Sequence, residues 1–205
     1  MSKKLKGMLF TENIDKIEDG TKTQTRRVAK QYRGESDIIS DPLSPTGFSN
    51  MHGYPIKPTY KVGDIIYVKE AYAEYIDEKI CYYYKADGWE RNRWRNPMYM
   101  PRKAARLFLK VLDVKCERLQ DISEADAIKE GIERSKDGPL FWHILDNSYP
   151  AWFNYNTHKE AFAYLWDKIN GKKNKSAYKW ENNPFVFVYE FERIAEPVGT
   201  GGEVE

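Results

Sequence analysis

The sequence predicts an α+β fold in which the strands curl into a small barrel and short helices lie between them. A chain of 205 residues is long enough for one domain with a substantial core. Its content of 41% hydrophobic and 15% aromatic residues excludes a disordered chain. Strand patterns of mixed spacing, with helix patterns at intervals between them, are typical of α+β proteins.

The strands are predicted from segments rich in β-branched and aromatic residues. These segments are residues 64–72, 79–86, 105–116 and 184–194. In the third segment, Leu107, Leu109 and Val111 fall on one face of the strand. In the last, every second residue from Phe185 to Phe191 is aromatic, which predicts one apolar face.

The helices are predicted from short amphipathic patterns with start and stop signals. They cover residues 12–19, 123–131 and 157–171. The first ends at a glycine. The second and third each begin with a capping box, formed by Ser123 with Asp126 and by Thr157 with Glu160.

We expect residues 1–195 to form a single domain. Residues 29–60 contain four prolines and three glycines without periodicity, which predicts a long loop or insertion. The Gly-rich tail, residues 196–205, has little to bury and is expected to be disordered.

Several classes of site are excluded by composition and spacing. Lysine and arginine number 33 against 31 acidic residues, so a site for a polyanion must be a local patch. The histidines lack zinc-ligand spacing, and there is no phosphate loop or dinucleotide fingerprint, so we expect no metal and no cofactor. Two distant cysteines and the lack of a long apolar run indicate a cytoplasmic protein with no membrane partner.

The segment "DGTKTQTRRV", residues 19–28, is the first candidate for chemistry. It follows the first predicted helix and contains Lys22 and Thr25. A lysine beside a hydroxyl group can act as its base once burial lowers the pKa of an amine toward neutrality. The alternative interpretation is a solvated basic turn.

Two carboxylates are in unusual positions. Glu130 is in the last turn of its predicted helix, where the helix dipole disfavours negative charge. It is therefore either exposed or held by a cation, for which Lys22 is one candidate. Glu70 shares a strand face with apolar residues and needs a partner, which we expect to be Arg26 or Arg27. This partnership is either a structural ion pair or part of a ligand site.

Aromatic residues precede two of the predicted strands. Trp94, Tyr99 and Trp180 lie near Asn-Pro pairs and have the flat rings needed to stack a nucleobase. The alternative is that they close the mouth of the barrel.

In combination these motifs resemble the ASCH domain family of the PUA-like superfamily, and most closely its larger phage and prophage members. The resembling segments are residues 8–28, 61–72, 96–132, 162–173 and 180–194. The resemblance implies a barrel of about five or six strands flanked by helices, a cleft beside the Lys22 turn, and inserts near residues 29–60 and 133–157.

A small bacterial member of the family is an amidohydrolase that deacetylates N4-acetylcytidine with a lysine, a threonine and a glutamate. Position by position, the resemblance implies that these catalytic residues are Lys22, Thr25 and Glu130. Thr25 or a water would attack the acyl carbon, Lys22 would transfer protons, and Glu130 would hold Lys22. Arg26 or a backbone N–H would stabilise the oxyanion.

The expected partner is a nucleoside or RNA substrate. The residues expected to bind it are Arg26, Arg27, Glu70, Arg102 and Trp180. Two alternatives stay open, because PUA-like folds serve several functions. One is a non-catalytic reader of RNA or modified nucleotides, in which the cations bind phosphate and an aromatic ring stacks the base. The other is an RNA nuclease that uses the same cations.

Overall fold

The computed structural model describes eight stretches of the chain. These are residues 5–29, 38–41, 43–44, 47–50, 52–77, 79–133, 155–171 and 176–197. Residues 198–205 of the predicted disordered tail and most of the second insert lie outside the described residues.

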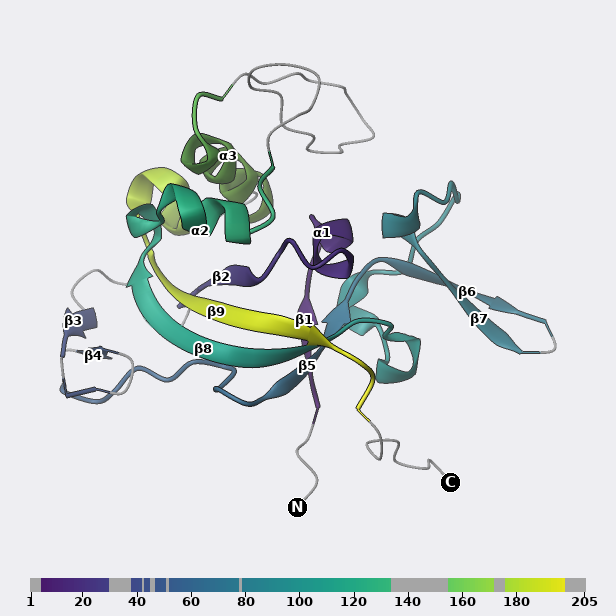
Figure 1. Cartoon of the computed structure of the whole chain (residues 1–205), viewed down its shortest axis with the longest axis horizontal. Helices are drawn as coiled ribbons and strands as arrows, with labels where there is room; N and C mark the ends of the chain where they lie inside the picture. The colour runs from purple at the N-terminus through teal and green to yellow at the C-terminus, as the bar shows by residue number, and fades with distance from the viewer. Residues whose placement is uncertain are drawn as a thin grey trace. The chain divides into compact units, whose positions relative to one another are not determined.

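The described residues contain helices and a mixed sheet, which confirms the α+β class (Figure 1). The strands are β1 (Lys6–Leu9), β2 (Gln24–Val28), β3 (Ile38–Ser40), β4 (Phe48–Asn50), β5 (Ile65–Lys69), β6 (Tyr72–Ile76), β7 (Ile80–Tyr84), β8 (Phe108–Arg118) and β9 (Phe185–Ile194). The α-helices are α1 (Ile14–Glu18), α2 (Glu124–Lys129) and α3 (His158–Asn170). In these stretches the largest sheet has five strands in the order β1-β5-β8-β9-β2, a number that agrees with the expected five or six.

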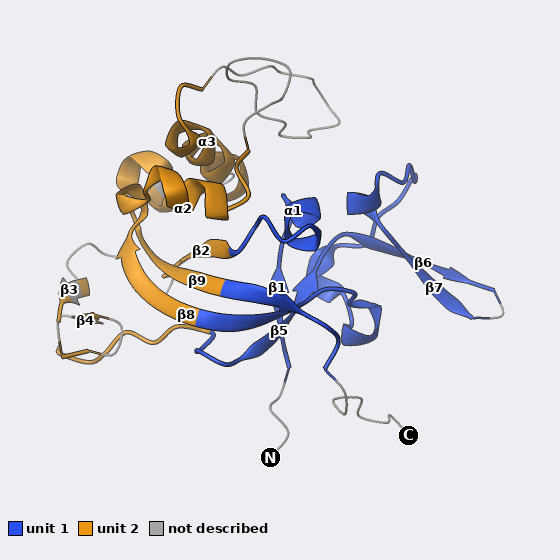
Figure 2. Ribbon diagram, viewed as in Figure 1, with its two compact units in different colours: residues 1–23, 60–112, 191–205 blue, residues 24–59, 113–190 orange. Residues whose placement is uncertain are grey.

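The chain divides into two compact units (Figure 2). Unit 1 comprises residues 1–23, 60–112 and 191–205, and unit 2 comprises residues 24–59 and 113–190. The two longest strands, β8 and β9, run from one unit into the other.

Unit 1 contains the strand pairs at the β1 end of the five-stranded sheet, one parallel and one antiparallel. β1 pairs in parallel with β5, and β5 pairs antiparallel with β8. The hairpin of β6 and β7 is a separate antiparallel pair in this unit. Its Tyr72 packs with Met100 and Ala104 in a small buried cluster. Alternation places Ile66 and Val68 of β5 on the buried face, as predicted.

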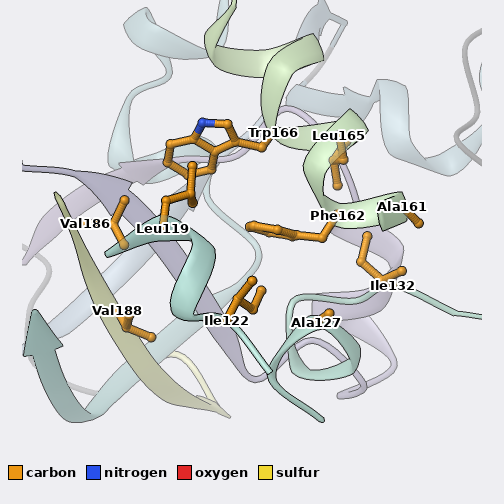
Figure 3. Close-up of a cluster of buried hydrophobic side chains, with 10 residues drawn as sticks. All are labelled: Leu119, Ile122, Ala127, Ile132, Ala161, Phe162, Leu165, Trp166, Val186 and Val188. Carbon is orange, nitrogen blue, oxygen red and sulfur yellow. The ribbon is translucent and has the colours of Figure 1, made fainter. Parts of the chain in front are cut away.

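Unit 2 is built on the antiparallel pair of β2 and β9, with α2 and α3 packed against it. Figure 3 shows the buried side chains that join the helices to the strand. They are Leu119, Ile122, Ala127, Ile132, Ala161, Phe162, Leu165, Trp166, Val186 and Val188. The valines of β9 alternate with its predicted aromatic residues, so both faces of this strand are covered.

The predicted starts of the second and third helices are confirmed, whereas α1 begins at Ile14 and not at Glu12. The Ser123 hydroxyl accepts a hydrogen bond from the backbone N–H of Asp126, at 3.1 Å, and caps α2. The Thr157 hydroxyl accepts one from the N–H of Glu160, also at 3.1 Å, and caps α3. Each bond satisfies an N–H that the first helical turn leaves without a partner inside the helix.

Two loop predictions are partly wrong. The end of the "DGTKTQTRRV" segment is strand β2, because its backbone pairs with β9 and Thr25 lies opposite Tyr189. The predicted loop of residues 29–60 contains the short antiparallel pair of β3 and β4. Neither strand has the length or alternation that would identify it from sequence alone.

Candidate functional site

Lys22 belongs to unit 1 and lies shortly after α1, which ends at Glu18. Its backbone N–H donates to the carbonyl of Lys16 at 2.7 Å, which anchors the segment to the end of the helix. The residue is only 7% exposed, although its side chain is cationic. The interpretation of this position as a solvated basic turn is therefore wrong.

Thr25 belongs to unit 2 and is buried in β2, with 4% of its surface exposed. Side chains alternate along a strand, so Gln24 and Arg26 share one face and Thr25 lies on the opposite face. The first face meets α2, because Arg26 contacts Glu130 at its C-terminal end. Thr25 is on the same face as Tyr189, its partner in β9.

Glu130 is the C-terminal cap residue of α2 and is 3% exposed. Its carboxylate accepts a hydrogen bond from Nη1 of Arg26, at 3.2 Å. The interpretation of Glu130 as an exposed carboxylate is thus wrong, and the alternative that a cation holds it is confirmed. Within unit 2 this cation is Arg26.

Arg26 lies at the centre of a polar cluster that sequence reasoning did not identify. Its side chain has no exposed surface. Nε and Nη2 donate to Glu117 at 3.0 and 2.7 Å, and Nη2 also lies 3.4 Å from Asp126. Nη1 donates to Gln24 at 2.7 Å as well as to Glu130. A guanidinium has five N–H donors, and here it makes four hydrogen bonds and one further ion pair, with Asp126.

The cluster extends along the same face of β2. The Gln24 side-chain amide, fully buried, donates to Glu190 at 3.0 Å, and Lys129 donates to Glu190 at 3.3 Å. A signal for this arrangement is present in the sequence: Gln24 and Arg26 are two residues apart, the spacing that puts polar side chains on one strand face. The acidic partners give no such signal, because they come from distant segments.

Glu70, in unit 1, has a different partner from the one expected. Its fully buried carboxylate accepts hydrogen bonds from Nε and Nη2 of Arg106, at 2.9 and 3.1 Å. The expectation of Arg26 or Arg27 as its cation is therefore wrong. A paired carboxylate and guanidinium fork is the geometry in which arginine binds carboxylates best.

Arg106 also meets other groups of unit 1. Its Nη1 lies 2.7 Å from Asp87 and 3.7 Å from Glu18, and its guanidinium lies 4.2 Å from the centre of the Tyr84 ring. Burial raises the pKa of Glu70, and the hydrogen bonds and charge of Arg106 oppose that rise. Burial, followed by the nearby charge of Glu70, raises the pKa of Tyr84 to about 12.

The raised pKa of Glu70 predicts a pH dependence of stability. The unfolded carboxyl titrates near 4.5, and the native one retains its proton to higher pH. Between the pKa of the unfolded state and that of the native state, the native protein binds more protons. The contribution of Glu70 to the free energy of unfolding is therefore greatest below the unfolded-state pKa, and it is lost as the pH rises through the native-state pKa. We expect the unfolding free energy of wild type minus that of Glu70→Gln to fall between pH 4 and pH 7. Urea titrations at several pH values measure this.

The control for that titration is Glu192→Gln, which removes an exposed carboxylate of the same unit that pairs with Lys110 at 3.2 Å. This variant should show nearly the same change in unfolding free energy with pH as wild type. A constant difference between wild type and Glu70→Gln across the range would contradict the raised pKa.

The other expected ligand-binding residues are distributed over both units. Arg27 in β2 and Arg102 in a 3-10 turn are half-buried. Trp180 is half-buried against the core of unit 2, where its ring meets that of Phe162 edge to face at 6.2 Å. Its backbone carbonyl accepts a hydrogen bond from Gln120 at 2.9 Å. Whether any of them binds a substrate stays a prediction.

The described stretches contain no group of three or more histidine, cysteine, aspartate or glutamate residues arranged to hold a metal ion. In the same part of the chain no helix has both the length and the apolar character needed to cross a bilayer.

Comparison with known proteins yields one similarity of fold. No family model and no curated protein matches the chain. It is similar to a solved structure described as the crystal structure of an ASCH domain from Lactobacillus crispatus JV V101. The similarity covers 89% of this chain and 70% of that one, with 11% identity and a TM-score of 0.39. At this identity and TM-score, no residue role passes from that structure to this chain.

Proposed function

We propose that the protein is an amidohydrolase that removes an acyl group from a modified nucleoside such as N4-acetylcytidine. The observation that supports this most directly is burial: Lys22, Thr25 and Glu130 are 7%, 4% and 3% exposed. Burial of a charged side chain costs free energy, and buried ionisable groups are enriched at functional sites. Burial of the three residues to which the resemblance assigns catalysis therefore supports the proposal.

In the proposed reaction the Thr25 hydroxyl attacks the acyl carbon while Lys22 accepts its proton. The tetrahedral intermediate then expels the N4 amine of cytidine, which takes the proton from Lys22. Water, again deprotonated by Lys22, attacks the acyl ester of Thr25. The bond from the acyl carbon to the Thr25 oxygen breaks, acetate leaves, and Lys22 returns the proton to that oxygen. A water molecule that attacks the substrate directly gives the same products without the ester.

In the proposed mechanism Glu130 would hold Lys22 and tune its charge. Arg26 is poorly placed to stabilise the oxyanion. Its N–H groups already donate to Glu117, Gln24 and Glu130, and its guanidinium also forms an ion pair with Asp126. We therefore assign oxyanion stabilisation to a backbone N–H of the Lys22 segment and give Arg26 the role of positioning Glu130.

The test is direct product analysis. Wild-type protein incubated with N4-acetylcytidine should release cytidine and acetate in equal amounts, separated by liquid chromatography. Glu130→Gln should lower the rate by about a hundredfold, the cost of misplacing a catalytic group. Glu181→Gln, an exposed carboxylate of the same unit, is the matched control and should react like wild type. A wild-type protein that releases no cytidine would reject the proposal.

A further inference from the structure

The hairpin formed by β6 and β7 leaves one strand edge open in unit 1. Among the described residues, β7 pairs with β6 and with no other strand. Figure 1 shows the two strands projecting away from β1 and β5 of the same unit. A ribbon of two strands is marginally stable in water, and an unpaired strand edge is a template on which another strand can add.

The hydrogen bonds at the two ends of the hairpin show which backbone groups face outward. The N–H of Lys85 donates to the carbonyl of Ala71 at 2.9 Å, and the N–H of Asp77 donates to the carbonyl of Lys79 at 3.2 Å. Bonded and non-bonded pairs alternate in an antiparallel ladder, so here the odd-numbered residues form the bonded pairs. The even-numbered residues of Ile80–Tyr84 therefore direct their backbone N–H and C=O groups away from β6. In the described part of the chain these backbone groups have no hydrogen-bond partner.

The outer edge of β6 is protected, whereas that of β7 is not. The carbonyl of Tyr72 in β6 accepts a hydrogen bond from the N–H of Arg95 at 2.8 Å, and the guanidinium of Arg95 pairs with Glu74 at 2.8 Å. Bonded backbone and charged side chains are common means of blocking an edge. β7 has no charged residue, and near the turn Ile80 is 47% exposed and Cys81 is also exposed.

We propose that β7 pairs with β7 of a second copy of this chain, antiparallel and about a twofold axis at Cys81. The outward groups of Ile80 in each copy then bond to those of Tyr82 in the other, which gives four intermolecular hydrogen bonds. The two hairpins together form one four-stranded sheet. The interface is independent of the amidohydrolase activity, since it includes none of the catalytic residues.

Charge complementarity favours a second copy as the occupant and selects this register. Asp77 and Lys85 lie four residues before and four residues after Cys81, so the axis places Asp77 of each copy opposite Lys85 of the other. Both side chains are exposed, and in the described stretches neither forms an ion pair. An axis at Tyr82 would instead place Lys79 opposite Lys85, and like charges directly opposite each other destabilise a sheet. The edge is thus complementary to itself.

The first measurement is sedimentation equilibrium of the full chain in reducing buffer. An edge of five residues buries less surface than the interface of a permanent dimer, so we expect a dissociation constant of about 10⁻⁵–10⁻³ M. Ile80→Pro should weaken dimerisation about tenfold, because it removes one N–H from each copy and so two of the four hydrogen bonds. Ile76→Pro is the matched control, since it changes an exposed outward position of β6, and it should associate like wild type.

Charge reversal tests the register without changing the backbone. Asp77→Lys and Lys85→Glu should each weaken association about threefold to tenfold, because each turns two attractive pairs of the dimer into repulsive ones. The double variant has opposite charges again and should dimerise like wild type. Both positions are exposed, so all three variants should stay folded by circular dichroism.

Cys81 reports the position of the axis. Facing residues at a non-bonded position have Cα atoms about 4.5 Å apart, a separation that a disulfide spans. With oxidised glutathione as the oxidant, both Cys81 thiols lose their protons to the buffer. One thiolate forms a mixed disulfide and releases a glutathione thiolate, and the second attacks the Cys81 sulfur and releases the other.

The linked dimer is measured on non-reducing gels over time. It should form faster in wild type than in a variant that combines Cys81→Ser with Lys57→Cys, which moves the thiol to an exposed position of unit 2. The buried thiol of Cys116 does not compete.

Four results would overturn the proposal. The first is a monomer at every concentration that cross-links no faster than the Lys57→Cys control. The second is a dimer that Ile80→Pro does not weaken, and the third is a double charge variant as weak as the single ones. The fourth is a monomeric wild type that binds an extended β-strand peptide and loses this binding in Ile80→Pro, since the partner of the edge would then be a different protein.

Discussion

Lys22→Ala and Thr25→Ala should each lower kcat/KM for N4-acetylcytidine by about 10²–10⁴-fold, the range for loss of a group that transfers a proton or attacks the substrate. The double variant should be little worse than either single variant, because residues that act in the same step are not additive. Initial rates of cytidine release measure these losses.

Stability must be measured beside the rates, because both side chains are buried. Lys57→Ala and Thr21→Ala are controls of the same residue types at exposed positions, and both should retain activity. Additive losses would show that Lys22 and Thr25 do not share a step. Full activity in Thr25→Ala, with loss in Lys22→Ala, would exclude the threonine nucleophile and leave water as the attacking group.

Arg26→Met should destabilise the protein by about 3–5 kcal/mol, the usual cost of removing one partner from a buried ion pair. The guanidinium that lies within 3.2 Å of both Glu117 and Glu130 would be replaced by an apolar side chain. Urea unfolding followed by circular dichroism measures the free energy.

The conservative and double variants distinguish charge from packing. Arg26→Lys keeps the charge but cannot supply five donors, so it should recover only part of the loss. Adding Glu130→Gln to Arg26→Met should cost less than the sum of the single changes, because it removes one uncompensated carboxylate. A loss below about 1 kcal/mol in Arg26→Met, as expected for a surface pair, would contradict the described cluster.

Short-range features were predictable because their causes are local. The caps at Ser123 and Thr157 follow from a hydroxyl placed three residues before the N–H that it accepts. The buried face of β5 follows from the alternation of Ile66, Val68 and Glu70. The need of a buried carboxylate such as Glu70 for a cation is also predictable. Removing a charge from water costs free energy in any fold unless the charge is paired.

Partner identity was not predictable in the same way. Arg106 is 36 residues from Glu70, and Arg26 is 91 residues from Glu117. No periodicity in the sequence relates such distant positions, and several arginines satisfy the same electrostatic requirement. The expected pairing of Glu70 with Arg26 or Arg27 was chemically reasonable, yet Arg26 is occupied by carboxylates of its own unit.

The sequence by itself therefore determined the buried apolar face of β5, the capped starts of α2 and α3, and the need of Glu70 for a counter-charge, but it left the burial of Lys22 and Glu130 open. Only the tertiary structure decided that Gln24–Val28 is a strand, since its backbone is satisfied by β9 rather than by neighbours in the chain. The same pairing sets Arg26 toward α2 and Thr25 toward the opposite face. The physical reason is that burial and alternation are properties of a local segment, whereas a hydrogen-bond partner depends on which distant segment the fold brings within about 3 Å.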